Sequence, residues 1–118
     1  MIIWITGAPG AGKTTTAYKF RERFTKSIVL DGDDCRKWLT PDCDFTEAGR
    51  LKHATRLWQV AAEIAAVGGT AICALMAKPP FPVQLLVLCQ GRSNPLWPGT
   101  TYAPPSNPDI VIYTGEQP

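Results

Sequence analysis

The chain has 118 residues, 45% of them hydrophobic and 19% charged, and its formal net charge is +2 at pH 7. This length predicts a single domain, residues 1–118, near the lower limit for a self-sufficient α/β core. The weak charge, without a block of Lys and Arg, argues for neither a nucleic-acid nor a membrane partner. Strand-like residues begin at Met1 and no apolar run could span a bilayer, so we expect a cytoplasmic protein without a signal peptide.

Residues 7–14, Gly-Ala-Pro-Gly-Ala-Gly-Lys-Thr, fit the phosphate-binding pattern G-x-x-x-x-G-K-[ST] in full. A β-branched apolar run at 1–6 precedes them and a helical pattern at 14–24 follows, which is the context this loop requires. In such a loop the backbone N–H groups face phosphate oxygens, the lysine reaches the outer phosphates and the threonine ligates Mg²⁺. The alternative is a glycine-rich turn without a ligand. The predicted ATP-binding residues are Gly7, Ala8, Pro9, Gly10, Ala11, Gly12, Lys13, Thr14 and Thr15, with Lys13 catalytic and Thr14 on the metal.

A second buried strand is predicted at 27–30, and it ends in an acidic turn, residues 31–34. Carboxylates at the C-terminal end of a parallel strand face the crevice where such sheets bind ligands. The predicted third strand carries no Asp, so this turn must supply the carboxylates. We predict Asp33 as the base or positioner of an acceptor hydroxyl, and Asp31 as a catalytic residue on the metal and its water, or as a structural residue. The alternative is a solvated turn or a helix N-cap at Asp33 or Asp34.

The short helix expected after this turn carries Arg36, whose guanidinium suits a phosphate or sulfate group. An isolated arginine is more often an ordinary surface charge.

A long helical pattern covers residues 47–67, and Gly68-Gly69 ends it. Near its start, Phe45 precedes Arg50, His53 and Arg56, which lie three residues apart and form a basic stripe. An aromatic ring beside basic side chains is suited to stack a base and hold its phosphate. The alternatives are a hydrophobic staple for Phe45 and a surface position for His53.

Strand patterns at 70–76, 83–89 and 110–113 complete an α/β fold, a three-layer sandwich with a small, mainly parallel sheet of four to five strands. Between the third and fourth strands, residues 77–82 are too few for a helical crossover. The fourth strand is therefore either antiparallel or reached by an extended crossover, which the paired prolines favour.

Residues 89–109 form an irregular, proline-rich loop, which in a compact domain is usually functional or mobile. Since no helix follows the last strand in this sequence, one sheet face is expected to be incompletely covered. That predicts self-association, as in a homodimer.

These residues resemble the adenylylsulfate kinase family, P-loop enzymes that phosphorylate the ribose 3′-hydroxyl of adenosine 5′-phosphosulfate in sulfate assimilation. The shared motifs are Gly-Ala-Gly-Lys-Thr at 10–14, Asp-Gly-Asp-x-x-Arg at 31–36, Phe-Thr at 45–46 with Arg-x-x-His-x-x-Arg at 50–56, and a Tyr/Pro segment at 102–109. The family has asparagine where His53 stands. The resemblance implies a P-loop nucleoside triphosphate hydrolase-like fold, ATP and Mg²⁺ as cofactors, and adenosine 5′-phosphosulfate as small-molecule partner.

The resemblance also implies roles for residues on the acceptor side. Asp33 would lie near the 3′-hydroxyl, Arg36 and Arg50 on the phosphosulfate, and Phe45 against the adenine, with Trp97 on the opposite face. The implied acceptor-binding residues are Asp33, Arg36, Phe45, Arg50, His53, Met76, Ala77 and Trp97.

The sequence departs from the family pattern after residue 75. The family's Ile-Ser-Pro stands here as Met76-Ala77-Lys78, and its crossover helix, basic lid and terminal helix have no counterpart. Arg92, the remaining arginine of the lid region, is expected to bind ATP in place of the missing lid residues. Because lids exclude water and place cations on the transferred group, we expect a slow kinase, one that leaks toward hydrolysis, or one helped by a partner subunit. The other hypotheses are an ATPase, a kinase of another small hydroxyl compound, and a nucleotide-binding module without turnover.

Overall fold

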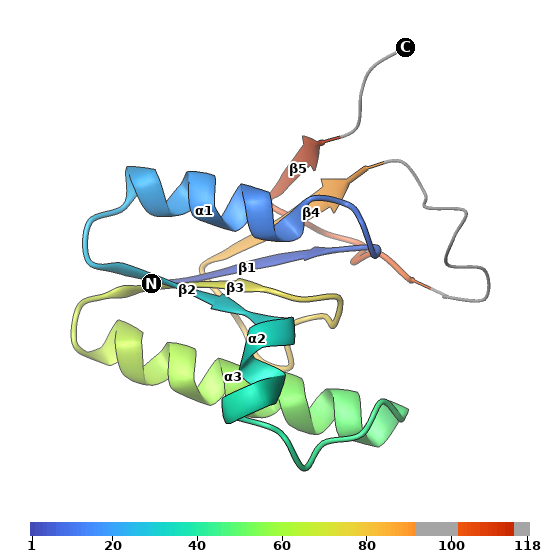
Figure 1. The fold of residues 1–118 in the computed structure, drawn as a ribbon. Helices are drawn as coiled ribbons and strands as arrows, with labels where there is room; N and C mark the ends of the chain where they lie inside the picture. Colours follow the sequence, from blue (N-terminus) through green and yellow to red (C-terminus); the bar gives the residue numbers. More distant parts are fainter. Residues whose placement is uncertain (92–101, 115–118) are drawn as a thin grey trace.

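The computed structural model describes residues 1–91 and 102–114, which form one parallel sheet between helices. The elements are β1 (Ile2–Gly7), α1 (Lys13–Arg23), β2 (Ser27–Asp31), α2 (Gly32–Trp38), α3 (Glu47–Ala66), β3 (Thr70–Ala74), β4 (Leu85–Gln90) and β5 (Ile110–Tyr113). The strand order is β2-β3-β1-β4-β5, and every neighbouring pair is parallel. Figure 1 shows α1 on one face of the sheet and α3 on the other. The predicted three-layer α/β fold is therefore confirmed.

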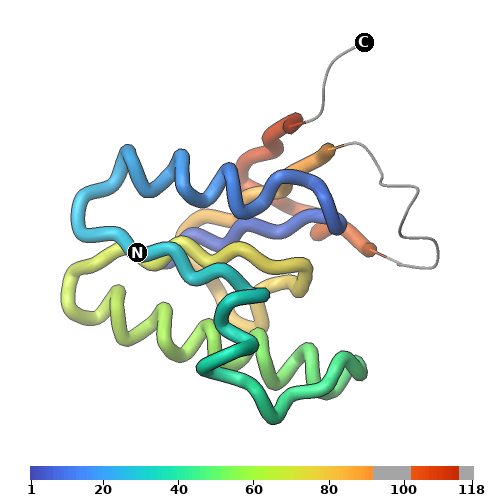
Figure 2. The backbone as a smooth tube through the Cα atoms, viewed as in Figure 1, coloured from blue at the N-terminus to red at the C-terminus, as the bar shows by residue number. Residues whose placement is uncertain are grey.

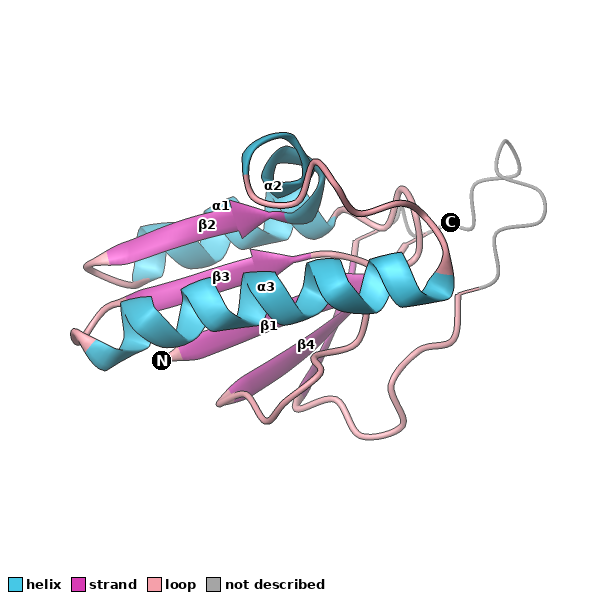
Figure 3. Ribbon diagram, turned by 90° about the horizontal axis from the view of Figure 1, so that it is seen from below, coloured by secondary structure: helices cyan, strands magenta, loops and turns pink. Residues whose placement is uncertain are grey.

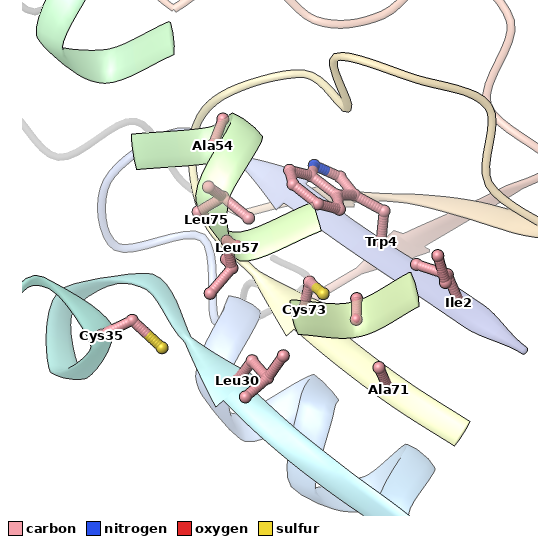
Figure 4. Packing of buried hydrophobic residues seen from close by; sticks show 10 residues of the cluster. Ile2, Trp4, Leu30, Cys35, Ala54, Leu57, Ala71, Cys73 and Leu75 are labelled. Atoms are coloured by element: carbon pink, nitrogen blue, oxygen red, sulfur yellow. The ribbon is translucent and has the colours of Figure 1, made fainter. Parts of the chain in front are cut away.

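Two buried clusters fill the spaces between the sheet and its helices. The central strand β1 contributes to both, because successive side chains of a strand point to opposite faces. Ile2 and Trp4 pack on the α3 side, where they meet Leu57, and Ile3 and Ile5 pack on the α1 side (Figure 4). Full burial of side chains of this size stabilises a fold by about 1.5–3 kcal/mol each. The position of β1 between two covered faces fixes the loop that follows it.

The connector, residues 75–84, joins β3 to β4 without a helix (Figure 2). Since β4 pairs in parallel with β1, the predicted extended crossover is confirmed and the antiparallel alternative is wrong. Two indoles hold the connector against the sheet and α3. Trp4 Nε1 donates to the carbonyl oxygen of Ala77 at 2.9 Å, and Trp58 Nε1 donates to that of Pro82 at 3.3 Å.

The β4–β5 side of the sheet is less covered than the β2–β3 side. Figure 3 shows α3 lying across β3 and β1, whereas loops of the described chain pass in front of β4. On β5, the exposed fractions are 38% for Ile110, 39% for Val111 and 68% for Tyr113. The expected open region is therefore present, and self-association through it stays a prediction. No helix within residues 1–91 and 102–114 is both long and apolar enough to cross a membrane.

Candidate functional site

One large cavity, of about 870 Å³, lies where β1, β2 and β3 end. This is the edge of a parallel sheet at which ligands bind. It brings together most of the predicted site residues: Pro9, Gly10, Gly12, Lys13, Thr14, Thr15, Asp31, Asp33, Arg36, Phe45, Arg50, His53, Met76 and Ala77. Three others, Gly7, Ala8 and Ala11, lie in the same loop but not on the cavity wall. Arg92 and Trp97 lie outside the described residues.

The glycine-rich loop, residues 7–14, takes its shape from backbone angles that favour glycine. Gly10 and Gly12 have φ angles of 79° and 84°, a region that costs other residues about 1–2 kcal/mol. Gly7 is required for a different reason, since a Cβ there would lie 2.7 Å from the carbonyl oxygen of Cys89. The loop is thus determined by main-chain conformation and by its close approach to β4.

The ammonium group of Lys13 lies over this loop and donates to the carbonyl oxygens of Gly7 and Ala8, both at 3.0 Å. Burial lowers the pKa of Lys13, and the nearby carboxylates of Asp33 and Asp31 act in the opposite direction. Both predicted carboxylates therefore line the same cavity as the lysine and lie near enough to affect its pKa. The arrangement concentrates opposite charges where phosphate groups would bind.

Asp31 connects the glycine-rich loop to α2. Thr14 Oγ1 donates to Asp31 Oδ2 at 3.3 Å, and Asp31 Oδ1 accepts from the backbone N–H of Asp33 at 3.1 Å. Asp31 is thereby the N-cap of α2, so the alternative that placed the cap at Asp33 or Asp34 is wrong. The exposed side chain of Asp33 does not serve as the cap.

The acceptor loop, residues 40–46, brings Phe45 to the cavity wall and is held by Arg36. Its Nη1 donates to the carbonyl oxygens of Cys43 at 3.0 Å and Asp44 at 3.2 Å. The guanidinium carbon lies 4.1 Å from the centroid of the Phe45 ring, a cation–π contact. Because Phe45 is 70% exposed, one face of its ring remains open to the cavity.

The staple alternative for Phe45 is wrong. Thr46 is the N-cap of α3 and its side chain accepts from the backbone N–H of Gly49. A staple would require an apolar residue four positions after the cap, and Arg50 occupies that position.

The predicted basic stripe of α3 is divided by the structure. Arg50 and His53 line the cavity, whereas Arg56 forms a bidentate ion pair with Asp42 at 2.6 and 2.9 Å. His53 is only 4% exposed, so its predicted surface alternative is wrong. Burial and the nearby Arg36 lower the pKa of His53, while the backbone of Gly32 and the charge of Asp33 oppose the shift.

The cavity also includes polar residues to which the sequence assigned no role. Tyr102 shares a 2.9 Å hydrogen bond between its hydroxyl and Thr6 Oγ1, and burial raises its pKa. Lys78 and Glu47 also line the wall. Lys78 could have been predicted at this site from its position four residues after the end of β3, because residues that follow parallel strands gather at this edge of the sheet. For Tyr102, only the resemblance at 102–109 pointed to the site.

Thr14 and Asp31 supply oxygen atoms of the type that Mg²⁺ prefers, and these atoms are already adjacent. The described ranges hold no group of three or more His, Cys, Asp or Glu residues that could bind a metal ion without further ligands. This donor set fits a cation that takes its other ligands from phosphate and water.

In a comparison with known protein families, residues 1–83 match the family described as adenylylsulphate kinase. The chain is 35% identical over 81 residues to the probable adenylyl-sulfate kinase of Aeropyrum pernix, covering 65% of this chain and 44% of the relative. It is 37% identical over 79 residues to the adenylyl-sulfate kinase of Myxococcus xanthus, covering 64% and 43%. The chain thus matches less than half the length of these relatives.

A third relative, the adenylyl-sulfate kinase of Acaryochloris marina, is 27% identical over 153 aligned positions, covering 98% of this chain and 74% of the relative. The alignment is longer than the 118 residues of this chain, so that relative has residues without a counterpart here.

Among solved structures, a mutant of the Mycobacterium tuberculosis APS kinase CysC has a TM-score of 0.72 and 26% identity, covering 95% of this chain and 84% of that one. The same enzyme in complex with AMPPNP and APS has a TM-score of 0.71 and 22% identity, covering 95% and 87%. At that identity the second likeness concerns the fold alone. The family match extends over well over half of the residues, from the glycine-rich loop through the acceptor loop to the connector, and the chain therefore belongs to the adenylylsulphate kinase family.

Proposed function

We propose that this protein is an ATP-dependent kinase that phosphorylates the 3′-hydroxyl of adenosine 5′-phosphosulfate. The observation that carries the proposal is the single cavity in which Lys13 faces Asp31 and Asp33 while Arg36 and Phe45 form the opposite wall. All five residues lie within the segment that matches the family. A loop that binds phosphate and a wall that binds a nucleotide thus share one space.

On the donor side, the glycine-rich loop would bind the phosphates of ATP through its backbone N–H groups and the start of α1. Lys13 would exchange its two carbonyl partners for phosphate oxygens and stabilise charge on the group in transfer. Thr14 and Asp31 would hold Mg²⁺, which neutralises phosphate charge when bound. A smaller cavity of about 340 Å³ beside Gly12, lined also by Tyr113 and Thr114, would accept the base of ATP.

On the acceptor side, the open face of Phe45 would stack on the adenine, and Arg36 and Arg50 would bind the phosphosulfate. Asp33 would orient the 3′-hydroxyl and accept its proton. The hydroxyl oxygen forms a bond to the terminal phosphorus of ATP as the bond from that phosphorus to the bridging oxygen breaks, and ADP leaves with the electron pair.

The test is to incubate the protein with ATP, Mg²⁺ and adenosine 5′-phosphosulfate and to measure phosphorylated acceptor and free phosphate separately. We expect acceptor phosphorylation that Asp33→Ala abolishes. Phosphate release without product would favour an ATPase or a kinase of another hydroxyl compound. Nucleotide binding with neither product would favour a module without turnover. The chain matches less than half the length of several relatives, and this experiment distinguishes the proposed kinase from its alternatives.

We also propose that the chain folds as one domain and self-associates through the exposed side of β5. The exposed fractions of Ile110, Val111 and Tyr113 support this proposal. Light scattering at tens of micromolar should give a mass above that of one chain, and a monomer at that concentration would contradict it.

A further inference from the structure

His53 is one of the few buried polar residues in the described part of the chain, and its ring has a hydrogen-bond partner outside α3. Its exposed fraction is 4%, and that of its partner Thr40 is 1%. The Nδ1 atom lies 2.7 Å from Thr40 Oγ1 in a buried hydrogen bond.

His53 and Thr40 belong to different parts of the fold, since His53 lies in α3. Thr40 follows α2, where its backbone N–H donates to the carbonyl of Cys35 at 3.2 Å, and its own carbonyl accepts from Cys43 at 3.1 Å.

Thr40 thereby begins the acceptor loop, whose later residues meet the Arg36 guanidinium and carry Phe45. One imidazole thus ties the base of the acceptor loop to α3.

We propose that His53 is a positioning residue that, through Thr40, holds the base of the acceptor loop against α3 and so fixes the place of Phe45 at the cavity. This inference rests on the proposed function and deepens it, because it assigns His53 to the support of the acceptor site and not to contact with the acceptor. Neutral imidazole suits the role. Protonation would place a second positive charge beside Arg36 and make Nδ1 a donor toward Thr40. The charged groups around the ring are Arg36 and Asp33 on α2, and Arg50 and Arg56 on its own helix, the latter paired with Asp42.

The decisive variant is Thr40→Val, which removes the hydroxyl, keeps the shape of the side chain and leaves His53 in place. Because Thr40 is buried, it cannot touch an acceptor nucleotide. We expect the dissociation constant and the KM for adenosine 5′-phosphosulfate to rise roughly three- to tenfold, the range for loss of one buried neutral hydrogen bond. The KM for ATP should not change. His53→Leu should have the same effect, and His53→Asn, which keeps a polar atom facing Thr40, should restore most of the affinity.

The matched control is Thr55→Val on α3, where the hydroxyl donates only to the carbonyl oxygen of Leu51 within the helix. It should leave both KM values unchanged. Melting temperatures of all variants exclude unfolding as the cause. An acceptor affinity that falls in His53→Leu and stays normal in Thr40→Val would overturn the proposal, because His53 would then touch the acceptor directly.

A second measurement does not depend on activity. The chain has a single histidine, so the nitrogen resonances of its imidazole are assigned without ambiguity. We expect a changed Nδ1 resonance in Thr40→Val but not in Thr55→Val. An Nδ1 resonance that is the same in the wild type and in Thr40→Val would overturn the inferred bond. If the wild type binds adenosine 5′-phosphosulfate without phosphorylating it, the proposed kinase activity fails while the binding and resonance measurements still decide the role of His53.

Discussion

The two walls of the cavity are built in different ways. The glycine-rich loop is defined by main-chain angles at Gly10 and Gly12, and its single reactive side chain, Lys13, rests on backbone carbonyls. The acceptor wall is defined by side chains, with Arg36 on backbone carbonyls and on Phe45. A wall formed by the backbone tolerates few substitutions. A wall formed by side chains can change its ligand specificity through single substitutions. This contrast predicts which substitutions remove ATP binding and which change only the acceptor.

The largest effect is expected where the backbone wall is broken. Gly12→Ala introduces a Cβ at φ 84° and 3.2 Å from Thr114 Cβ. It should abolish ATP binding, measured by calorimetry, and lower stability. Gly68→Ala is the matched control, because Gly68 has a φ of 87° with no atom within 4 Å of the added Cβ. It should cost only about 1–2 kcal/mol of stability. Equal ATP affinity in the two variants would contradict the assignment of the loop.

Removal of the lysine charge tests the chemistry of that wall without changing its backbone. We expect Lys13→Met to reduce kcat by about 10²–10³, the range for loss of one donor that stabilises charge in a transition state. Lys37→Met is the control, because Lys37 is an exposed lysine that pairs with Asp34 on the surface at 3.6 Å. Steady-state kinetics of both variants decide the matter, and a Lys13→Met enzyme with normal turnover would exclude the proposed role.

The side-chain wall should respond more weakly and only toward the acceptor. Phe45→Ala should raise the KM for adenosine 5′-phosphosulfate by a factor of about 5–100, the range for one base-stacking contact, and leave the KM for ATP unchanged. Because Phe45 is 70% exposed, its loss should hardly affect the melting temperature. Trp38→Ala removes another exposed aromatic residue, 61% exposed, and serves as the control. Similar effects of the two variants on the acceptor KM would refute stacking on Phe45.

The smallest effect concerns the pH dependence of folding. Burial lowers the pKa of His53 in the folded chain, so the unfolded chain, with its ordinary pKa near 6.5, takes up the proton first. The contribution of His53 to stability is therefore full above that pH and declines as the pH falls below it, by at most about 1.4 kcal/mol per pH unit. We measure the free energy of unfolding of the wild type and of His53→Asn by denaturant between about pH 5 and 8, the range in which histidine titrates. This free energy should change less with pH in the variant. Unfolding free energies that change equally with pH in the two proteins would contradict the lowered pKa of His53.

Much of the fold could be predicted from the sequence because its signals are local. The apolar strands, the glycine-rich loop and the glycine pair after α3 each depend on neighbours in the chain. For β4, the length of the connector left both directions possible, and the stiffness of the proline pair favoured the parallel one that the structure has. The carboxylate turn was also placed correctly beside Lys13, because strand ends of a parallel sheet meet at one edge.

The partners of the charged side chains could not be predicted in the same way. Arg50, His53 and Arg56 repeat every three residues, and each step of three turns about 60° backward around a helix with 3.6 residues per turn. Arg56 therefore lies about 120° from Arg50 and meets Asp42. The burial of His53 depends on Thr40, which lies thirteen residues away in the sequence, and no periodicity of α3 reveals it.

The two indoles that hold the connector give the molecule an internal optical probe. Trp4 is fully buried, and Trp58 packs against Phe81 with ring centroids 4.9 Å apart and ring planes tilted by 57°. Both donate to carbonyls of the same segment, which also supplies Met76 and Ala77 to the cavity wall. Because indole emission depends on hydrogen bonding and polarity, the intrinsic fluorescence of the protein should respond when a nucleotide fills the cavity, without an added dye.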